Sequence, residues 1–180
     1  MTTNVDWPGR GPTWLGVPAL VVALVGVLML ADVSYRQNLG HELLDGGGEA
    51  VASSVQVFSG RGGLGDVEVA FRTDGGREVK AVLAETGTDD EGMPEGLQAP
   101  APGTRYAPPL TINYRRSDPT VAVASVDAQE WVADRRTPVI SRWMIAGGLA
   151  VTLVALAGLT RGARRRGVAW WRWFSPAPGD

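Results

Sequence analysis

Glycines at positions 60, 62 and 65 match the G-x-G-x-x-G spacing of a dinucleotide-binding loop. In that loop the glycines let the backbone approach a pyrophosphate, and the helix that follows directs its N-terminus at the phosphates. Here the next residues, Asp66 to Phe71, alternate between polar and apolar, which predicts a strand. We therefore expect residues 60–65 to form a loop between two strands, and the chain to bind no nucleotide cofactor.

Histidine and cysteine chemistry is almost excluded by composition. The chain has one histidine, His41, and no cysteine, so it has no thiolate nucleophile, disulfide or cysteine-based metal or haem site. A histidine zinc site or a Ser/His/Asp triad would have to be built around His41 alone. The acids Asp89, Asp90 and Glu91 are consecutive and lack the alternate spacing and fixed glycine of a calcium loop. The sequence thus predicts no metal site.

Carboxylates flank one predicted hairpin, at Asp66, Glu68, Asp74 and Glu78. Glycoside hydrolysis uses a pair of carboxylates, so a hydrolase of envelope material is one hypothesis for these residues. However, alternation places Glu68 on the polar face that any surface strand has. Solubility is a sufficient explanation of these acids, and we predict no catalytic residues.

The C-terminal tail, residues 160–180, interleaves arginines with tryptophans. Tryptophan prefers the depth of the lipid headgroups, and each arginine near an anionic cytoplasmic leaflet gains about 1 kcal/mol. Nucleic acid could bind the same residue types, but a stretch this short beside an apolar run favours a lipid anchor and no nucleic-acid partner. The predicted membrane-interface residues are Trp14, Trp143, Arg161, Arg164, Arg165, Arg166, Trp170, Trp171, Arg172 and Trp173.

Two apolar stretches, residues 14–33 and 138–159, are long enough to cross a membrane as helices. The first holds one charge, Asp32, at its end. The second holds Arg142 one turn from its start, where a long side chain can extend to the headgroups. A cleaved signal peptide is disfavoured for the first, because no A-x-A cleavage site follows it. We predict two transmembrane helices in a cell membrane.

Charge predicts the orientation of these helices. Arginines near the ends of membrane helices favour the cytoplasmic side. The two terminal segments contain six such arginines (10, 161, 164, 165, 166 and 172), whereas the middle ends of the helices have four (36, 135, 136 and 142). Residues 34–137 contain sixteen acids and ten bases. We therefore expect residues 1–13 and 160–180 to be cytoplasmic and the middle to be extracytoplasmic. Sixteen arginines against one lysine, with much alanine, glycine and valine, suggest a GC-rich bacterial genome, such as that of an actinobacterium.

The middle of the chain predicts a β-rich domain at residues 52–137. Residues 34–51 have a helical pattern broken by glycines, which predicts a stalk extending the first helix. Asp74, Gly75 and Gly76 predict a tight hairpin turn. Residues 87–103 are acidic and rich in proline and glycine, which predicts a mobile loop. Five strands are expected, at residues 52–58, 66–72, 78–83, 110–115 and 121–126, in a small antiparallel sheet or open barrel. The predicted fold class is therefore a membrane α+β protein.

Small residues in the two apolar stretches predict close helix packing. The predicted contact residues are Gly16, Ala19, Ala23 and Gly26 in the first stretch and Ala146, Gly147, Ala150 and Gly158 in the second. The same residues could instead dock the chain onto another membrane protein or a second copy.

The order of these pieces resembles a bacterial family. A strand ending in VQVF, the strand-turn-strand unit VEVAFRTDGGREVKAV and the segment from Tyr106 to Val123 lie between the two apolar stretches. Together, with Tyr114, Asp118 and Pro119 as the most specific residues, they resemble the membrane proteins grouped as domain of unknown function 3592. This chain departs in lacking a glycine before the LTINY strand and in its long acidic loop. The resemblance implies a small β-domain between two helices and carries over no catalytic residues.

From the sequence we predict a non-enzymatic protein whose extracytoplasmic β-domain contacts a protein or envelope partner. The alternative is an accessory subunit that docks onto a larger membrane complex through its helices. An envelope hydrolase is the least favoured hypothesis.

Overall fold

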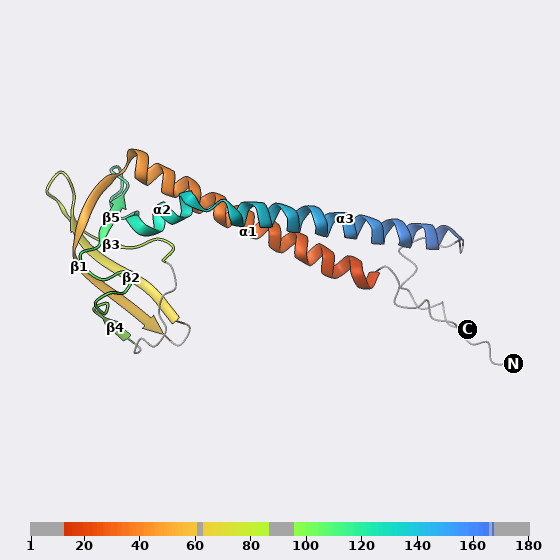
Figure 1. The fold of residues 1–180 in the computed structure, drawn as a ribbon, viewed down its shortest axis with the longest axis horizontal. Helices are drawn as coiled ribbons and strands as arrows, with labels where there is room; N and C mark the ends of the chain where they lie inside the picture. Colours follow the sequence, from red (N-terminus) through yellow and green to blue (C-terminus); the bar gives the residue numbers. More distant parts are fainter. Residues whose placement is uncertain (1–12, 61–62, 87–95, 166, 168–180) are drawn as a thin grey trace. The chain divides into compact units, whose positions relative to one another are not determined.

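The structure is a computed structural model that describes residues 13–60, 63–86, 96–165 and 167. The chain divides into two compact units, one made of residues 1–31 and 136–180 and the other of residues 32–135 (Figure 1). In chain order the elements are α1 (Thr13–Gly46), β1 (Gly48–Gly60), β2 (Gly63–Arg72), β3 (Glu78–Val82), β4 (Gly96–Gln98), β5 (Thr111–Tyr114), β6 (Ala122–Ala124), α2 (Ser125–Ala133) and α3 (Arg136–Arg165).

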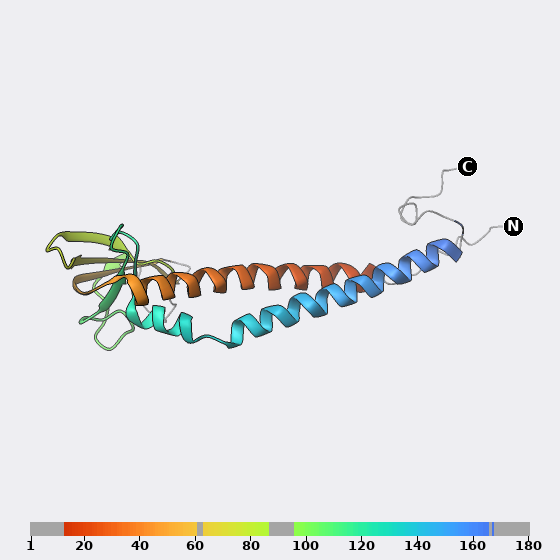
Figure 2. The ribbon, with the colours of Figure 1, turned by 90° about the horizontal axis from the view of Figure 1, so that it is seen from above.

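The first unit contains the N-terminal part of α1 and the whole of α3. These two segments lie side by side (Figures 1 and 2). Both helices are long and apolar enough to span a membrane. Small residues hold them close together: a Cβ on Gly26 would lie 2.9 Å from the backbone oxygen of Ser141, and one on Gly148 would lie 2.5 Å from that of Ala19. The hydroxyl of Thr152 donates to the Gly148 oxygen at 2.8 Å and to the Gly16 oxygen at 3.3 Å.

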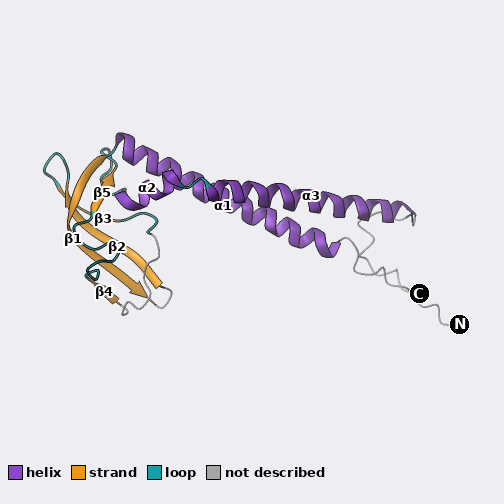
Figure 3. Cartoon of the chain, in the orientation of Figure 1, coloured by secondary structure: helices purple, strands orange, loops and turns teal. Residues whose placement is uncertain are grey.

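The second unit is built on a curled antiparallel sheet, a half-barrel with strand order β3-β2-β1-β5-β6 (Figure 3). Strand β1 is long enough to serve two neighbours, pairing with β5 through residues 48–51 and with β2 through residues 52–60. Strand β4 also pairs with β1, at residues 57–59. A parallel bridge between Leu83 and Ala122 brings the chain after β3 to β6, the other edge strand.

Alternation along the strands fills the inside of this sheet. The residues Val67, Val69 and Phe71 of β2 are fully buried, whereas Asp66 and Arg72 are exposed. Strand β3 alternates in the same way. The buried core of the sheet comprises Ala52, Val55, Val57, Val67, Val69, Phe71, Val79, Ala81, Leu83, Tyr106, Leu110, Ile112, Tyr114, Ala122 and Ala124.

A second, smaller apolar cluster joins the end of α1 to β6 and α2. Leu39 and Leu43 of α1 pack with Val123 of β6 and Ala128 of α2. Gly40 permits this approach, since a Cβ there would lie 3.0 Å from a methyl group of Val132. The end of α1 therefore belongs to the β-domain.

Three sequence predictions require correction. The predicted stalk, 34–51, does extend the first helix, which runs to Gly46, but residues 48–51 begin β1. The predicted strand 121–126 is shorter, because β6 ends at Ala124 and the unpredicted helix α2 begins at Ser125. Residues 96–98, expected in a mobile loop, form β4, because backbone pairing with β1 requires no apolar composition. Residues 87–95 of the predicted loop lie outside the described residues.

Candidate functional site

The β2–β3 turn forms one wall of the candidate site. The N–H of Thr73 donates to the oxygen of Arg77 at 2.9 Å and the N–H of Gly76 to the oxygen of Thr73 at 2.8 Å. Gly76 has a φ of +77°, a conformation that glycine adopts without steric cost. The turn therefore forms at Asp74, Gly75 and Gly76, where the hairpin signal lies.

The β5–β6 turn forms the opposite wall. The N–H of Arg115 donates to the oxygen of Val121 at 3.0 Å, which closes the turn. Inside it, Asp118 accepts hydrogen bonds from the hydroxyl of Thr120 at 2.6 Å and from its N–H at 3.2 Å. These bonds, with the nearby arginines Arg115 and Arg77, lower the pKa of Asp118.

Tyr114 connects the two turns. Its hydroxyl accepts a hydrogen bond from the N–H of Asp74 at 2.9 Å, and its ring packs on Phe71 with the ring centres 5.2 Å apart. The ring also lies against Gly48, where a Cβ would come within 2.3 Å of the Tyr114 Cζ atom. The side chain is almost completely buried. Tyr114 thus fixes the spacing of the two turns.

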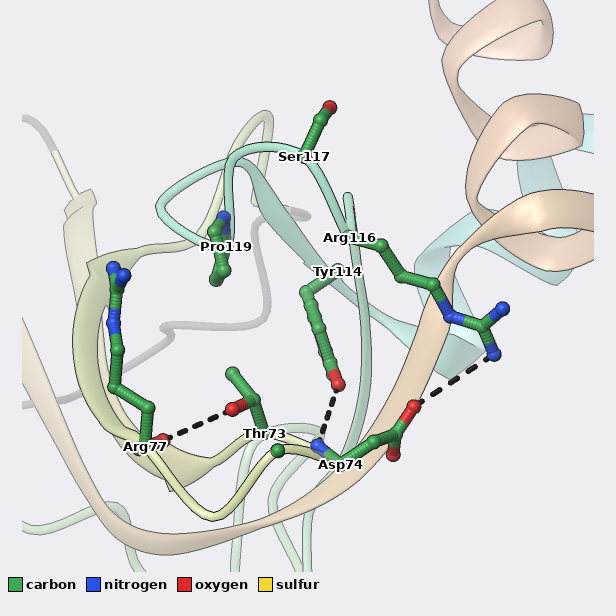
Figure 4. A pocket seen from close by; sticks show the side chains of 8 residues that line it. Thr73, Asp74, Arg77, Tyr114, Arg116, Ser117 and Pro119 are labelled. Atoms are coloured by element: carbon green, nitrogen blue, oxygen red, sulfur yellow. Dashed lines mark hydrogen bonds and ion pairs between the residues drawn. The ribbon is translucent and has the colours of Figure 1, made fainter.

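Between the turns lies an open hollow of about 350 Å³ (Figure 4). Two of its lining side chains are cationic, Arg77 and Arg116, and one, Asp74, is anionic. Arg116 pairs with Asp74 at 3.7 Å, but both side chains are more than half exposed, so solvent screens the pair. The lining residues are Thr73, Asp74, Gly75, Arg77, Tyr114, Arg116, Ser117 and Pro119.

The hollow has the chemistry of a binding site. Exposed guanidinium groups recognise carboxylates and phosphates through paired hydrogen bonds. The hydroxyl of Ser117 has no histidine among the lining residues to act as its base. Among the residues that the structure describes, no group of three or more His, Cys, Asp or Glu side chains could hold a metal ion.

An ionic cluster built around the buried Asp127 lies elsewhere in the domain and joins the segment before β5 to α2. Arg105 donates to Asp127 at 2.7 Å and to Glu130 at 2.5 Å, and the hydroxyl of Tyr106 donates to Asp127 at 3.0 Å. Burial raises the pKa of Asp127 although Arg105 opposes the shift, whereas Glu130 and Asp127 together raise the pKa of Arg105. Sequence reasoning missed this cluster, because no local pattern pairs residues this far apart in the chain.

Other residues considered for chemistry do not converge. The glycine run lies in the β1–β2 hairpin, where Gly60 pairs with Gly63, while residues 61 and 62 are outside the described part. His41 lies 3.7 Å from Asp45 on an exposed face of α1. Asp66 is exposed and Glu68 is half-buried on the same strand, with Val82 opposite Glu68.

The predicted membrane-interface residues divide into described and undescribed ones. Trp14 and Trp143 are 67% and 74% exposed and lie in α1 and α3. Arg161, Arg164 and Arg165 are exposed in the last turns of α3. The predicted interface residues Arg166, Trp170, Trp171, Arg172 and Trp173 lie outside the described residues.

The helix contact differs from the predicted one on α3. On α1, the predicted Ala23 and Gly26 are buried, and Gly16 and Ala19 also face α3. On α3, the buried residues are Ser141, Gly148, Ala155, Leu159 and Ala163, whereas the predicted residues Ala146, Gly147, Ala150 and Gly158 are exposed. Small residues occur all around α3, so composition alone does not select the contact face.

Comparison with protein-family models, with curated proteins and with solved structures found no match to this chain. The resemblance to domain of unknown function 3592 therefore stays a prediction, based on the residues given above.

Proposed function

We propose that α1 and α3 anchor this chain in a membrane. The supporting observation is the location of its exposed apolar side chains: of the 23 large exposed ones among the described residues, ten lie at positions 14–28 and eight at 139–156. Only 11% of the most apolar segment of α1 and 17% of that of α3 are buried. A core helix of a soluble protein would be mostly buried, and soluble monomers rarely expose contiguous apolar surface of this extent.

Extraction of native membranes tests the anchor directly. Alkaline carbonate strips peripheral proteins but leaves bilayer-spanning chains in the pellet. We expect the full chain to stay with the membrane in carbonate and to leave it only in detergent. Release by carbonate alone would reject the anchor.

We further propose that the β-domain, held on the outer side of the membrane, contacts a protein or envelope partner at the hollow between the β2–β3 and β5–β6 turns. The support is the exposure of Arg77 and Arg116 on walls whose spacing Tyr114 fixes. Two cations against one anion favour an acidic group on the partner. Fixed walls reduce the entropy cost of binding.

One observation favours a second candidate function, that of an accessory subunit in a larger membrane complex. The residues Ala146, Gly147 and Ala150 of α3 are exposed and not used against α1. Small residues on a lipid-facing surface permit close approach of another helix.

Co-purification with matched variants separates the two functions. The full chain, tagged at its C-terminus and crosslinked in native membranes, is purified as wild type, as Arg77→Glu with Arg116→Glu, and as Gly147→Leu with Ala150→Leu. Loss of a stoichiometric partner only in the arginine variant supports the binding module. Loss only in the helix variant supports the accessory subunit and contradicts the binding module. Circular dichroism checks that each variant is folded.

A further inference from the structure

Arg142 occupies an unusual place on α3. It lies near the start of the apolar part of this helix, and its side chain is exposed. Its neighbours one turn away on the same face, Val139 and Ala146, are exposed as well. Trp143, the next residue, is 74% exposed. A guanidinium group therefore projects from an otherwise apolar helix surface, and an exposed indole follows it in the sequence.

This guanidinium has no partner within the described part of the chain, where Arg142 makes no hydrogen bond or ion pair. Residues 135–165 contain no aspartate or glutamate. The corresponding end of the apolar run of α1 is different, because Arg36 pairs there with Asp32 at 3.2 Å and with Glu85 at 2.9 Å. The positive charge of Arg36 is therefore paired with acids, whereas that of Arg142 is not paired among the residues that the structure describes.

An uncompensated guanidinium at this depth requires an anion. Placing an arginine in the hydrocarbon costs several kcal/mol, which the side chain avoids by extending to the headgroups. There it meets phosphate, whose oxygens match the paired donors of a guanidinium. The exposed indole of Trp143 suits the same depth. A carboxylate on a partner protein would offer a similar charge, but in a phospholipid bilayer a lipid-facing arginine at the headgroup level meets phosphate first.

Resting on the proposed membrane anchor, we propose that Arg142 binds the phosphate of a phospholipid headgroup in the outer leaflet, with Trp143 beside it. This contact would set the depth of α3 in the bilayer. It is distinct from the tail at the other end of α3, whose arginines face the opposite leaflet in the proposed orientation.

Photolabelling in vesicles tests the contact at this position. The full chain is reconstituted in phosphatidylcholine and phosphatidylglycerol vesicles that contain a trace of phosphatidylglycerol with a photoreactive group at the headgroup. Peptide mapping compares labelling of residues 136–143 with labelling of residues 161–165, the internal reference. The variants are Arg142→Gln, Arg142→Lys and, as a matched control at an exposed arginine of β2, Arg72→Gln.

We expect Arg142→Gln to reduce the ratio of the two signals about tenfold, since a paired charged hydrogen bond is lost. Arg142→Lys should reduce it less, because lysine keeps the charge without the paired geometry. Arg72→Gln should leave it unchanged. An unchanged ratio in Arg142→Gln would overturn the inference, as would equal labelling by a photoreactive glucosyl diacylglycerol, which has no phosphate.

Further outcomes identify the source of the anion and separate a failure of this inference from a failure of the membrane anchor. Suppression of labelling by millimolar inorganic phosphate would indicate free phosphate as the ligand and overturn the lipid assignment. Retention in carbonate together with no Arg142-dependent labelling rejects only this inference and would point to a protein carboxylate. Release in carbonate rejects the anchor itself, so the two failures are distinguishable.

Discussion

Tyr114 joins two turns that lie forty residues apart in the chain. Its hydroxyl holds the β2–β3 turn, while its own strand leads into the β5–β6 turn, in which Asp118 binds Thr120. Tyr114, Asp118 and Pro119 are the residues that carry the family resemblance most specifically. In this structure they lie in the turns around the hollow. A resemblance at these positions therefore indicates a shared fold rather than a shared activity.

Tyr114→Phe removes the acceptor of the Asp74 N–H and keeps the ring packed on Phe71. A typical hydrogen bond contributes about 1 kcal/mol, and we expect the free energy of unfolding to fall by roughly that amount. Chemical unfolding of the full chain in detergent micelles, followed by near-ultraviolet circular dichroism, measures it. Tyr35→Phe, at an exposed tyrosine, is the control. Equal stability of Tyr114→Phe and wild type would contradict the role given to the hydroxyl.

Gly48→Ala tests the close approach of Gly48 to the same ring. The added methyl group would lie 2.3 Å from the Tyr114 Cζ atom, so the ring or the strand has to move. Overpacking of this kind costs about 1–3 kcal/mol. Gly46→Ala is the matched control, because a Cβ there has nothing within 4 Å. The same unfolding measurement should separate the two variants, and similar stabilities would refute the predicted contact.

Glu42 and Arg115 give the domain a predictable acid sensitivity. Arg115 donates two hydrogen bonds to the Glu42 carboxylate, one of them at 2.7 Å, and they lower the pKa of Glu42 below its ordinary value of 4.5. A lowered folded-state pKa means that the stabilisation is complete above the unfolded-state pKa and is lost as pH falls through the folded-state pKa.

The stability gap between wild type and Glu42→Gln should therefore be present at neutral pH and close in acid. Thermal unfolding of the full chain at a series of pH values measures this gap. Glu49→Gln, which removes the charge of an exposed strand residue, is the control and should show no such closure. A gap that stays constant into acid would disprove the contribution of the ion pair.

At the scale of elements, local pattern was sufficient where an element is defined by its own residues. Apolar residues at every second position, Val67, Val69 and Phe71, predicted β2. The glycine-rich turn after it predicted the pairing of β2 with β3. The two apolar helices follow from length and composition.

Elements that depend on distant partners could not be predicted in this way. Helix α2 buries Asp127, which is paired with Arg105 and Tyr106, about twenty residues earlier in the chain. Strand β4 exists because β1 offers it a free edge. The hollow was equally hidden: both turns were predicted separately, but their meeting depends on the strand order β2-β1-β5, which no local signal specifies.

The contact face of α3 can be tested at two adjacent glycines. Gly148→Ala places a methyl group 2.5 Å from the Ala19 oxygen and 2.8 Å from the Ala23 Cβ atom, whereas Gly147→Ala meets nothing within 4 Å. Both changes raise helix propensity alike, by about 1 kcal/mol in water. We expect Gly148→Ala to lower the unfolding temperature of the full chain in micelles relative to Gly147→Ala. The reverse order would place the contact on the other face of α3.

At the scale of the whole molecule, charge and hydropathy are segregated along the sequence. The acidic β-domain lies between two apolar helices in the sequence, and the cluster of arginines begins in the last turns of the second one. Because basic residues near the ends of membrane helices are retained in the cytoplasm, this segregation supports both termini inside and the domain outside. Every proposal for the hollow and for Arg142 depends on this orientation.

The absence of native cysteine makes the orientation directly testable. Ser117→Cys places one thiol at an exposed position beside the hollow, and Ser175→Cys places one in the tail. In intact cells with a permeable outer layer, a membrane-impermeant maleimide should label Ser117→Cys and should label Ser175→Cys only after the membrane is opened. The cysteine-free wild type reports background. Labelling of Ser175→Cys in intact cells with protection of Ser117→Cys would invert the topology, place the hollow in the cytoplasm and exclude an envelope partner for it.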